Sequence, residues 1–499
     1  MNPITRRQFL IRGGAGLAGV ALSSPLLDVL ARPAFAAAAD EFPGPFTDLF
    51  ASIVADLETK FPYASALYTS SSGITMRRDR NGRSVSESPF GTRGVTLRVF
   101  DGRVFHESAV GSTEPDALRA AAKTLRGEVA PATQRTAIEP LPARTQVWRT
   151  PMRVDPDSLS LAERMARLDR EFERGEWDDP RIRNVTVTTS ADRIRRVFVD
   201  RTRRLASETV MISHSLFLVG FDQGRPGFGF ARNVAQGGLE LAELAEAQIE
   251  RSRRETVEMF GAGRVAAGEY EVILAPEVTG LLAHESFGHG VEMDQFVKDR
   301  AKAREFLGKK VASDMVTMYD DPSLPGARGS YPFDDEGALA ARTQIIEGGV
   351  FRQPLTDLAS AVRLGVARTP NGRTQGWNRK VYPRMSNTFF GRGTTAKDEV
   401  FASLADGLYL EGFRNGVEDP QGWGIQFTAS RAREVKGGKL TGRVFTPATV
   451  SGYVPEILSN ITRIGDDFAI EPGTCGKGFK EFVPVGSGGP HIRTRARVS

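Results

Sequence analysis

Cysteine and histidine are scarce in this sequence of 499 residues, which contains one cysteine, Cys475, and five histidines. A single cysteine excludes an intramolecular disulfide. Long apolar runs are also scarce. Beyond the N-terminal segment, no stretch approaches the roughly 20 apolar residues that a membrane-spanning helix needs. The sequence therefore predicts no stable membrane anchor in the mature protein.

The sequence also has little excess charge. Its formal charge is +5, but residues 1–36 contain four arginines and one aspartate, and without them the charge falls to +2. A chain so close to neutral gives no electrostatic argument for a nucleic acid partner. Because 499 residues exceed one ordinary core, we expect two or more domains.

The first 36 residues follow the order of an export signal. The paired arginines Arg6 and Arg7 are followed by a mildly apolar run from Gly13 to Leu30 and by the cleavage pattern Ala34-Phe35-Ala36. The arginine pair resembles the twin-arginine class. The alternative is a basic amphipathic start or a membrane anchor. We expect a signal peptide at residues 1–36 and a periplasmic or secreted protein, exported by the twin-arginine route.

Residues 40–260 and 265–499 differ in pattern. The first segment mixes helical periodicity, as from Phe46 to Phe61, with alternating strand patterns, which is typical of a mixed α/β domain. In the second segment glycine and proline separate many short strands. The sequence therefore predicts an α+β protein with a C-terminal, predominantly antiparallel, curved or barrel-like β domain that carries the histidine-rich segment.

Some local expectations follow from periodicity. We expect separate strands at Val185–Thr189 and Ile194–Val199, and one long charged helix from Leu239 to Phe260. In the C-terminal segment we expect a buried strand at Tyr270–Leu274 and, within residues 308–499, one helical interval near Ala396–Asp406.

Two of the five histidines, His284 and His289, share one short segment with Glu285. Imidazoles can hold a Lewis-acidic cation, and an adjacent glutamate can take a proton from water. This pairing favours Glu285 as a general base over a metal ligand. On a regular helix a separation of five residues leaves the two histidines roughly 140° apart. We therefore expect a π-type bulge, or unwinding at Gly288, that brings them together.

A catalytic zinc usually has three protein ligands and a water, so a third ligand is needed. Cys475 lies in a glycine-rich run beside Lys477, whose charge would favour the thiolate. A buried free cysteine without a metal is an equal alternative. His106 and His214 fit structural or surface roles better, and for His491 a surface role is equally favoured.

Four motifs follow one another along the second half of the chain, namely Leu282-Ala-His284-Glu285-Ser-Phe-Gly-His289-Gly290, Asp334-Asp335-Glu336-Gly337, Pro383-Arg384-Met385-Ser386-Asn387-Thr388, and Cys475-Gly476-Lys477 with Val483-Pro484-Val485-Gly486. In this order they resemble the TldD/PmbA family of metallopeptidases. The match over residues 40–260 is looser.

The resemblance implies a zinc-dependent peptidase that cleaves unfolded or extended peptides. It implies one Zn2+ per chain bound by His284, His289 and Cys475, with Glu285 as general base. One branch of the family lacks the H-E-x-x-x-H run, so this chain resembles the active branch. The usual family dimer implies a homodimer or a heterodimer with a related subunit. Family members commonly act in the cytoplasm, so their substrates are not transferred to a chain with an export signal.

Some roles remain open. Arg384 and Asn387 are candidates for stabilising the transition state or binding substrate, and a structural turn is an equal alternative. For Asp334, Asp335 and Glu336 a charged turn is favoured over a second cation site. The alternative functions are a catalytically silent peptide-binding or scaffolding subunit of a heterodimer, and a zinc hydrolase of a non-peptide amide or ester.

Overall fold

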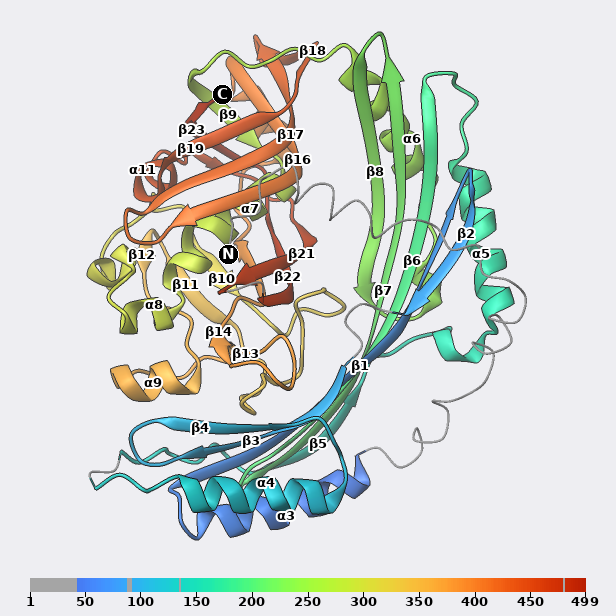
Figure 1. The fold of residues 1–499 in the computed structure, drawn as a ribbon. Helices are drawn as coiled ribbons and strands as arrows, with labels where there is room; N and C mark the ends of the chain where they lie inside the picture. The colour runs from blue at the N-terminus through green and yellow to red at the C-terminus, as the bar shows by residue number, and fades with distance from the viewer. Residues whose placement is uncertain (1–42, 88–91, 134–135, 479–480) are drawn as a thin grey trace, which may run out of the picture.

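A computed structural model describes residues 43–87, 92–133, 136–478 and 481–499, and the expected signal peptide lies outside these ranges. A long curved sheet from the N-terminal half partly surrounds a body formed by the C-terminal half (Figure 1). In the part of the chain that the structure describes, no helix has the length and apolar character needed to span a membrane.

The N-terminal sheet has eight strands in the order β4-β3-β1-β6-β7-β5, with β2 paired to β1 and β8 to β7. The strands are β1 (Tyr63–Asp79), β2 (Gly82–Glu87), β3 (Thr92–Phe100), β4 (Phe105–Val110), β5 (Arg144–Arg149), β6 (Ile182–Val199), β7 (Arg203–Asp222) and β8 (Arg225–Gln236). The expectation of two strands within residues 185–199 is wrong, because β6 is continuous. Its polar middle, around Ser190, pairs with Thr75 of β1 and Ser213 of β7, so tertiary pairing overrides the local pattern.

Helices α3 (Gly44–Glu58), α4 (Pro115–Glu128) and α5 (Leu161–Gly175) lie on the outer side of this sheet (Figure 1). The start of α5 is fixed by a capping box between Ser160 and Glu163. The expected helix from Leu239 to Phe260 is too long, since α6 is Glu246–Phe260. The backbone N–H of Leu244 donates instead to the carboxylate of Glu171, and this contact holds residue 244 outside the helix.

The C-terminal half contains a ring of five strands. It consists of β9 (Gly268–Leu274), β16 (Asp406–Asp419), β17 (Gly424–Lys436), β19 (Ala448–Tyr453) and β23 (Ile492–Val498). The order β16-β9-β23-β19-β17 closes through the pairing of β16 with β17, while β18 (Lys439–Phe445) and β20 (Arg463–Ile464) pair with single ring strands. Only the β16–β9 pair of the ring is parallel. The predicted α+β fold with a barrel-like C-terminal half is confirmed.

A second, six-stranded sheet lies beside the ring in the order β12-β11-β10-β15-β22-β21. Its strands are β10 (Met318–Asp320), β11 (Thr343–Glu347), β12 (Val350–Phe351), β15 (Asn387–Phe390), β21 (Ala469–Lys477) and β22 (Glu481–Gly489), and β13 (Gly372–Arg373) pairs separately with β14 (Tyr382–Pro383). Short helices lie between the strands of the C-terminal half: α8 (Met293–Val297), α9 (Leu358–Leu364), α10 (Lys397–Ala402) and α11 (Val454–Ser459). The expected helix near Ala396–Asp406 is confirmed as α10, but the expectation that it is the one helical interval of residues 308–499 is wrong, because α9 and α11 also lie there. Helices of six or seven residues are too short to show a helical period.

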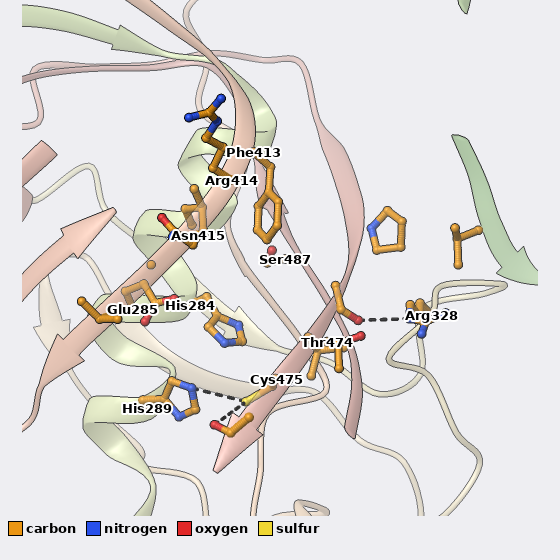
Figure 2. A pocket seen from close by; sticks show the side chains of 18 of the residues that line it. His284, Glu285, His289, Arg328, Phe413, Arg414, Asn415, Thr474, Cys475 and Ser487 are labelled. Atoms are coloured by element: carbon orange, nitrogen blue, oxygen red, sulfur yellow. Dashed lines mark hydrogen bonds between the residues drawn. The ribbon is translucent and has the colours of Figure 1, made fainter. Parts of the chain in front are cut away.

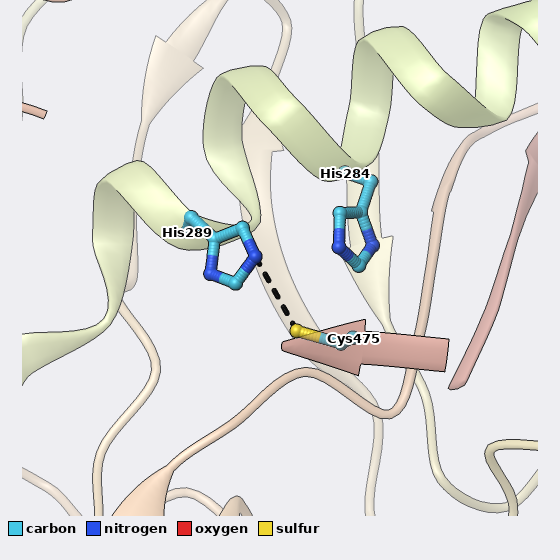
Figure 3. A group of neighbouring side chains, drawn as sticks. All are labelled: His284, His289 and Cys475. Carbon is cyan, nitrogen blue, oxygen red and sulfur yellow. Dashed lines mark hydrogen bonds between the residues drawn. The ribbon is translucent and has the colours of Figure 1, made fainter. Parts of the chain in front are cut away.

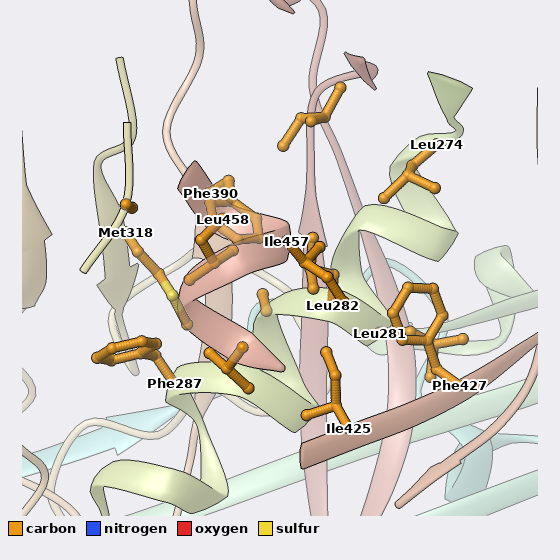
Figure 4. Packing of buried hydrophobic residues seen from close by; sticks show 14 of the residues in the cluster. Leu274, Leu281, Leu282, Phe287, Met318, Phe390, Ile425, Phe427, Ile457 and Leu458 are labelled. Atoms are coloured by element: carbon orange, nitrogen blue, oxygen red, sulfur yellow. The ribbon is translucent and has the colours of Figure 1, made fainter. Parts of the chain in front are cut away.

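Helix α7 (Pro276–Phe287) lies at the centre of this half and contacts both the ring and the second sheet. Leu281, Leu282 and Phe287 pack in one cluster with residues of β17 and α11 (Figure 4). Burial of each such side chain stabilises the fold by about 1.5–3 kcal/mol. Because most residues of α7 are buried, packing holds its C-terminal end in place, and that end carries His284 and Glu285.

The acidic motif at residues 334–336 fastens the two halves together. Glu336 forms a buried ion pair with Arg98 of β3, and Asp335 lies 3.1 Å from Arg196 of β6. Arg368 lies within 3.6 Å of Glu336. These acids are buried and matched by arginines, so the structure explains the motif by ion pairing between the halves and not by a second cation.

Candidate metal centre

The helix that carries His284 ends where the sequence predicts a distortion. Helix α7 stops at Phe287, Gly288 has φ −86° and ψ −80°, and a 3-10 turn (η5, His289–Val291) follows. A Cβ at residue 288 would lie 2.1 Å from the sulfur of Met385, so close packing requires the glycine. The ring centroids of His284 and His289 are 5.0 Å apart. The predicted unwinding at Gly288 is confirmed.

Cys475 reaches the same place from strand β21, almost 200 residues later in the chain. Its sulfur lies 3.3 Å from Nε2 of His289. One donor atom each from His284, His289 and Cys475 lies within 4.8 Å of the others. Figure 3 shows the two imidazoles and the sulfur facing one point. Ligands at zinc distances of 2.0–2.3 Å lie roughly 3.5 Å apart in a tetrahedral site. The 3.3 Å between the sulfur and Nε2 of His289 matches this spacing, and two imidazoles with a thiolate are ligands that zinc takes.

A buried carboxylate orients His289. Its Nδ1 lies 3.1 Å from Oε2 of Glu292, which is 1% exposed. The ammonium of Lys477 donates to Glu292 at 2.8 Å and to Asp294 at 2.5 Å. Burial opposes the charge on Glu292, but Lys477 and His289 lower its pKa to about 2. Because Nδ1 contacts Glu292, it is Nε2 that faces the cysteine sulfur.

The environment of the Cys475 thiol differs from the expectation. Lys477 does not stabilise the thiolate, since its ammonium group forms ion pairs with Glu292 and Asp294 instead. Burial opposes ionisation of Cys475, but His289 and His284 outweigh it and hold the pKa of the thiol well below its ordinary value. Arg384, which is 1% exposed, donates from Nη2 to the carbonyl of Cys475 at 2.8 Å and to its sulfur at 3.3 Å. Arg384 therefore fixes both the backbone and the sulfur of Cys475.

Asn387 lies away from the metal centre. It is fully buried, and its amide nitrogen donates to the carbonyl of Asp321 at 2.7 Å. Its amide oxygen accepts from the backbone N–H of Gly329 at 3.1 Å. Neither Arg384 nor Asn387 lines the cavity described below, and Asn387 is a buried structural residue at the start of β15 rather than part of a turn.

The remaining histidines have other partners. His106 lies 2.9 Å from Asp101, and His491 lies 2.6 Å from Asp467. His214 is fully buried and bonds to Thr189 at 2.8 Å. Across the described ranges, His284, His289 and Cys475 are the one group of three or more such side chains that could share a metal ion.

Glu285 lies beside the histidines and against strand β16. It is 6% exposed, and a Cβ at Gly416 would lie 2.5 Å from its Cγ. Burial raises the pKa of Glu285, while His284 and His289 lower it to a smaller extent. A second glutamate, Glu418, is close by on β16, and burial raises its pKa to about 8. The sequence offered no signal for Glu418, which belongs to no motif.

The metal centre opens onto a cavity of about 870 Å3 between the two halves (Figure 2). Strands β16 and β21 provide one side, including Phe413 and Thr474. The N-terminal sheet provides the other through residues of β7 and β8, such as Ser213 and Arg232. This contribution was not predicted, because these residues lie in ordinary alternating strands and reach the cavity only through the curvature of the sheet.

Comparison with known proteins shows to which family the chain belongs. A family model described as the PmbA/TldA metallopeptidase C-terminal domain matches residues 267–498. A protein from Methanocaldococcus jannaschii named metalloprotease is 32% identical over 325 residues, 64% of this chain and 71% of that protein. Another metalloprotease, from Archaeoglobus fulgidus, is 31% identical over 360 residues, 70% of this chain and 80% of that protein. The chain belongs to the TldD/PmbA family.

The fold of this family member also resembles solved structures. TldE from Thermococcus kodakarensis matches with a TM-score of 0.71 and 17% identity, over 90% of this chain and 100% of that chain. At this identity the likeness shows the fold alone. The α+β architecture is therefore shared along almost the whole described chain.

Proposed function

We propose that this protein is a zinc-dependent peptidase that cleaves unfolded or extended peptides, with Glu285 as general base. The observation that carries the proposal is the convergence of His284, His289 and Cys475 beside a buried glutamate at the wall of a large cavity. Three ligands facing an open space are the arrangement of a catalytic zinc, whereas structural zinc sites usually have four protein ligands. The relatives named metalloproteases support this function.

His284 and His289 would hold one Zn2+ through imidazole nitrogens, and Cys475 would hold it through its thiolate. When bound, the ion supplies a Lewis acid that acidifies a water molecule and polarises the peptide carbonyl. Glu292 keeps His289 in the tautomer that presents Nε2. Arg384 keeps the cysteine in place by donating to both its carbonyl and its sulfur.

Glu285 would move the protons of the reaction. Its carboxylate lies at the cavity beside the histidines, and Gly416 leaves room for it against β16. The pKa of Glu285 is raised above the ordinary value of a glutamate, which strengthens it as a base. It takes a proton from the attacking water and delivers a proton to the leaving amine.

The position of the cavity favours an extended substrate. It lies between the N-terminal sheet and the C-terminal half, so a peptide bond within a folded domain would not reach Glu285. We further propose a dimer, either with itself or with a related subunit, and export by the twin-arginine route. That route carries folded proteins, so the zinc could bind before the thiol of Cys475 meets an oxidising compartment.

A catalytically silent subunit and a hydrolase of non-peptide amides are less well supported. A silent subunit needs neither a glutamate at the cavity beside the histidines nor three converging His and Cys side chains, and this chain has both. A non-peptide amide would need only a fraction of a cavity of about 870 Å3 that runs between two halves of the chain.

The proposal is tested by incubating purified protein of known metal content with a diverse peptide pool and identifying the products by mass spectrometry. We expect cleavage by the wild type, loss in Glu285→Gln with zinc retained, and wild-type activity in the control Glu305→Gln, whose carboxylate is on the surface. Cleavage by Glu285→Gln at the normal rate would show that the base is wrongly assigned. Intact peptides together with zinc-loaded wild-type protein would contradict the peptidase function.

A further inference from the structure

A large apolar side chain is exposed beside the polar catalytic groups. Phe413 of β16 is 39% exposed and lines the cavity. Figure 2 shows its ring directed into the cavity, on the side of His284 and Ser487. An exposed phenylalanine next to a reacting centre removes water from one side of it and offers a surface for another apolar group.

The pairing of β16 with β17 is irregular at Phe413. Phe413 is opposite Ala429 of β17 and Asn415 is opposite Thr428, so Arg414 has no partner residue on that strand. Such a β-bulge redirects side chains and is common next to active sites. The hydroxyl of Ser430 donates to the carbonyl of Phe413 at 3.2 Å. The bulge lies on the same strand as Gly416, which packs against Glu285, so it fixes Phe413 relative to the base.

Other exposed apolar side chains line the same cavity. Val417, also on β16, is 63% exposed, and Phe230 of β8 is 45% exposed. The acids that line the cavity, including Glu285 and Glu292, are buried near the histidines. The cavity therefore combines a catalytic region with apolar side chains that are partly exposed to it.

We propose that Phe413 forms the wall of an apolar subsite, which selects a large apolar side chain in the substrate residue next to the scissile bond. This inference rests on the proposed peptidase function, since it assigns specificity to the same cavity. It names a substrate class: extended peptides with leucine- or phenylalanine-like residues at the cleaved bond.

The test uses peptides that are identical except for the residue next to the cleaved bond, which is leucine, phenylalanine, alanine or serine. For wild-type protein we expect kcat/KM to be ~10- to 100-fold higher with leucine or phenylalanine than with serine. In Phe413→Ala this preference should fall by ~10-fold, with little change for the serine peptide. Phe413→Leu should restore most of it. The matched control is Phe221→Ala, which removes a ring that is 45% exposed and outside the cavity lining.

A binding measurement separates this inference from the proposed function. Fluorescently labelled leucine and serine peptides are titrated into zinc-loaded Glu285→Gln protein, with and without Phe413→Ala. If the wild type cleaves none of the peptides, the peptidase function fails, and tighter binding of the leucine peptide that depends on Phe413 still supports the subsite. The inference is overturned if Phe413→Ala weakens the binding of the leucine and serine peptides equally. It is also overturned if Phe413→Ala changes the oligomeric state and leaves the peptide selectivity unchanged.

Discussion

Replacing Gly416 with alanine places a methyl group against Glu285. The added Cβ would lie 2.5 Å from both Cγ and Oε1 of Glu285 and 2.6 Å from its Cδ, whereas ordinary contacts begin near 3.4 Å. The side chain must therefore move by about 1 Å, and its 6% exposure leaves little room for it to do so while keeping its place in the cavity. A displacement of that size costs about 100-fold in rate.

We therefore expect Gly416→Ala to lower kcat by about 100-fold, equivalent to about 3 kcal/mol of activation free energy. Zinc content should stay at one per chain, because the three atoms nearest the added methyl group all belong to Glu285. The assay combines peptide cleavage with metal analysis. The control is Gly424→Ala on the neighbouring strand β17, where a Cβ meets nothing within 4 Å. Full activity in Gly416→Ala, or loss of zinc with loss of activity, would refute this account of Glu285.

Other predictions concern the groups behind the ligands. Lys477→Met should destabilise the metal-free protein by about 3–5 kcal/mol in urea unfolding, because it leaves Glu292 buried without its cation, and Glu292→Gln in the same chain should recover part of the loss. The pKa of Glu292 is lowered to about 2, so the metal-free protein should keep this stabilisation above pH 4.5 and lose it as the pH falls toward 2. A free energy of unfolding that does not change over that pH window would contradict this role of Glu292. Arg384→Met should weaken zinc binding about 10- to 100-fold in competition with a chelator, because Cys475 loses its donor, while unchanged affinity would limit Arg384 to packing.

The motif formed by His284, Glu285 and His289 was predictable because its members are close in sequence. His284, Glu285 and His289 lie within six residues, and the five-residue spacing required the break that the structure shows at Gly288. The role of Cys475 could not be predicted from its neighbours in the sequence. Its glycine-rich surroundings left two interpretations equal, and only the family resemblance favoured a ligand over a buried thiol.

Contacts made by tertiary structure could not be predicted. Lys477 was expected to act on its neighbour two residues away, but its long side chain reaches Glu292 and Asp294, which lie far earlier in the sequence. The ring of five strands is closed by the pairing of β16 with β17, and this pairing puts Phe413 and Glu418 at the cavity. No local pattern of residues indicates that the ring of strands closes.

The central claim is that His284, His289 and Cys475 share one zinc ion. The most direct measurement is zinc X-ray absorption of the purified, zinc-loaded protein. We expect a first shell with two imidazole nitrogens, one sulfur near 2.3 Å and one further light atom, and we expect the sulfur to disappear in Cys475→Ala. A shell without sulfur in the wild type, or an unchanged spectrum in Cys475→Ala, would contradict the account.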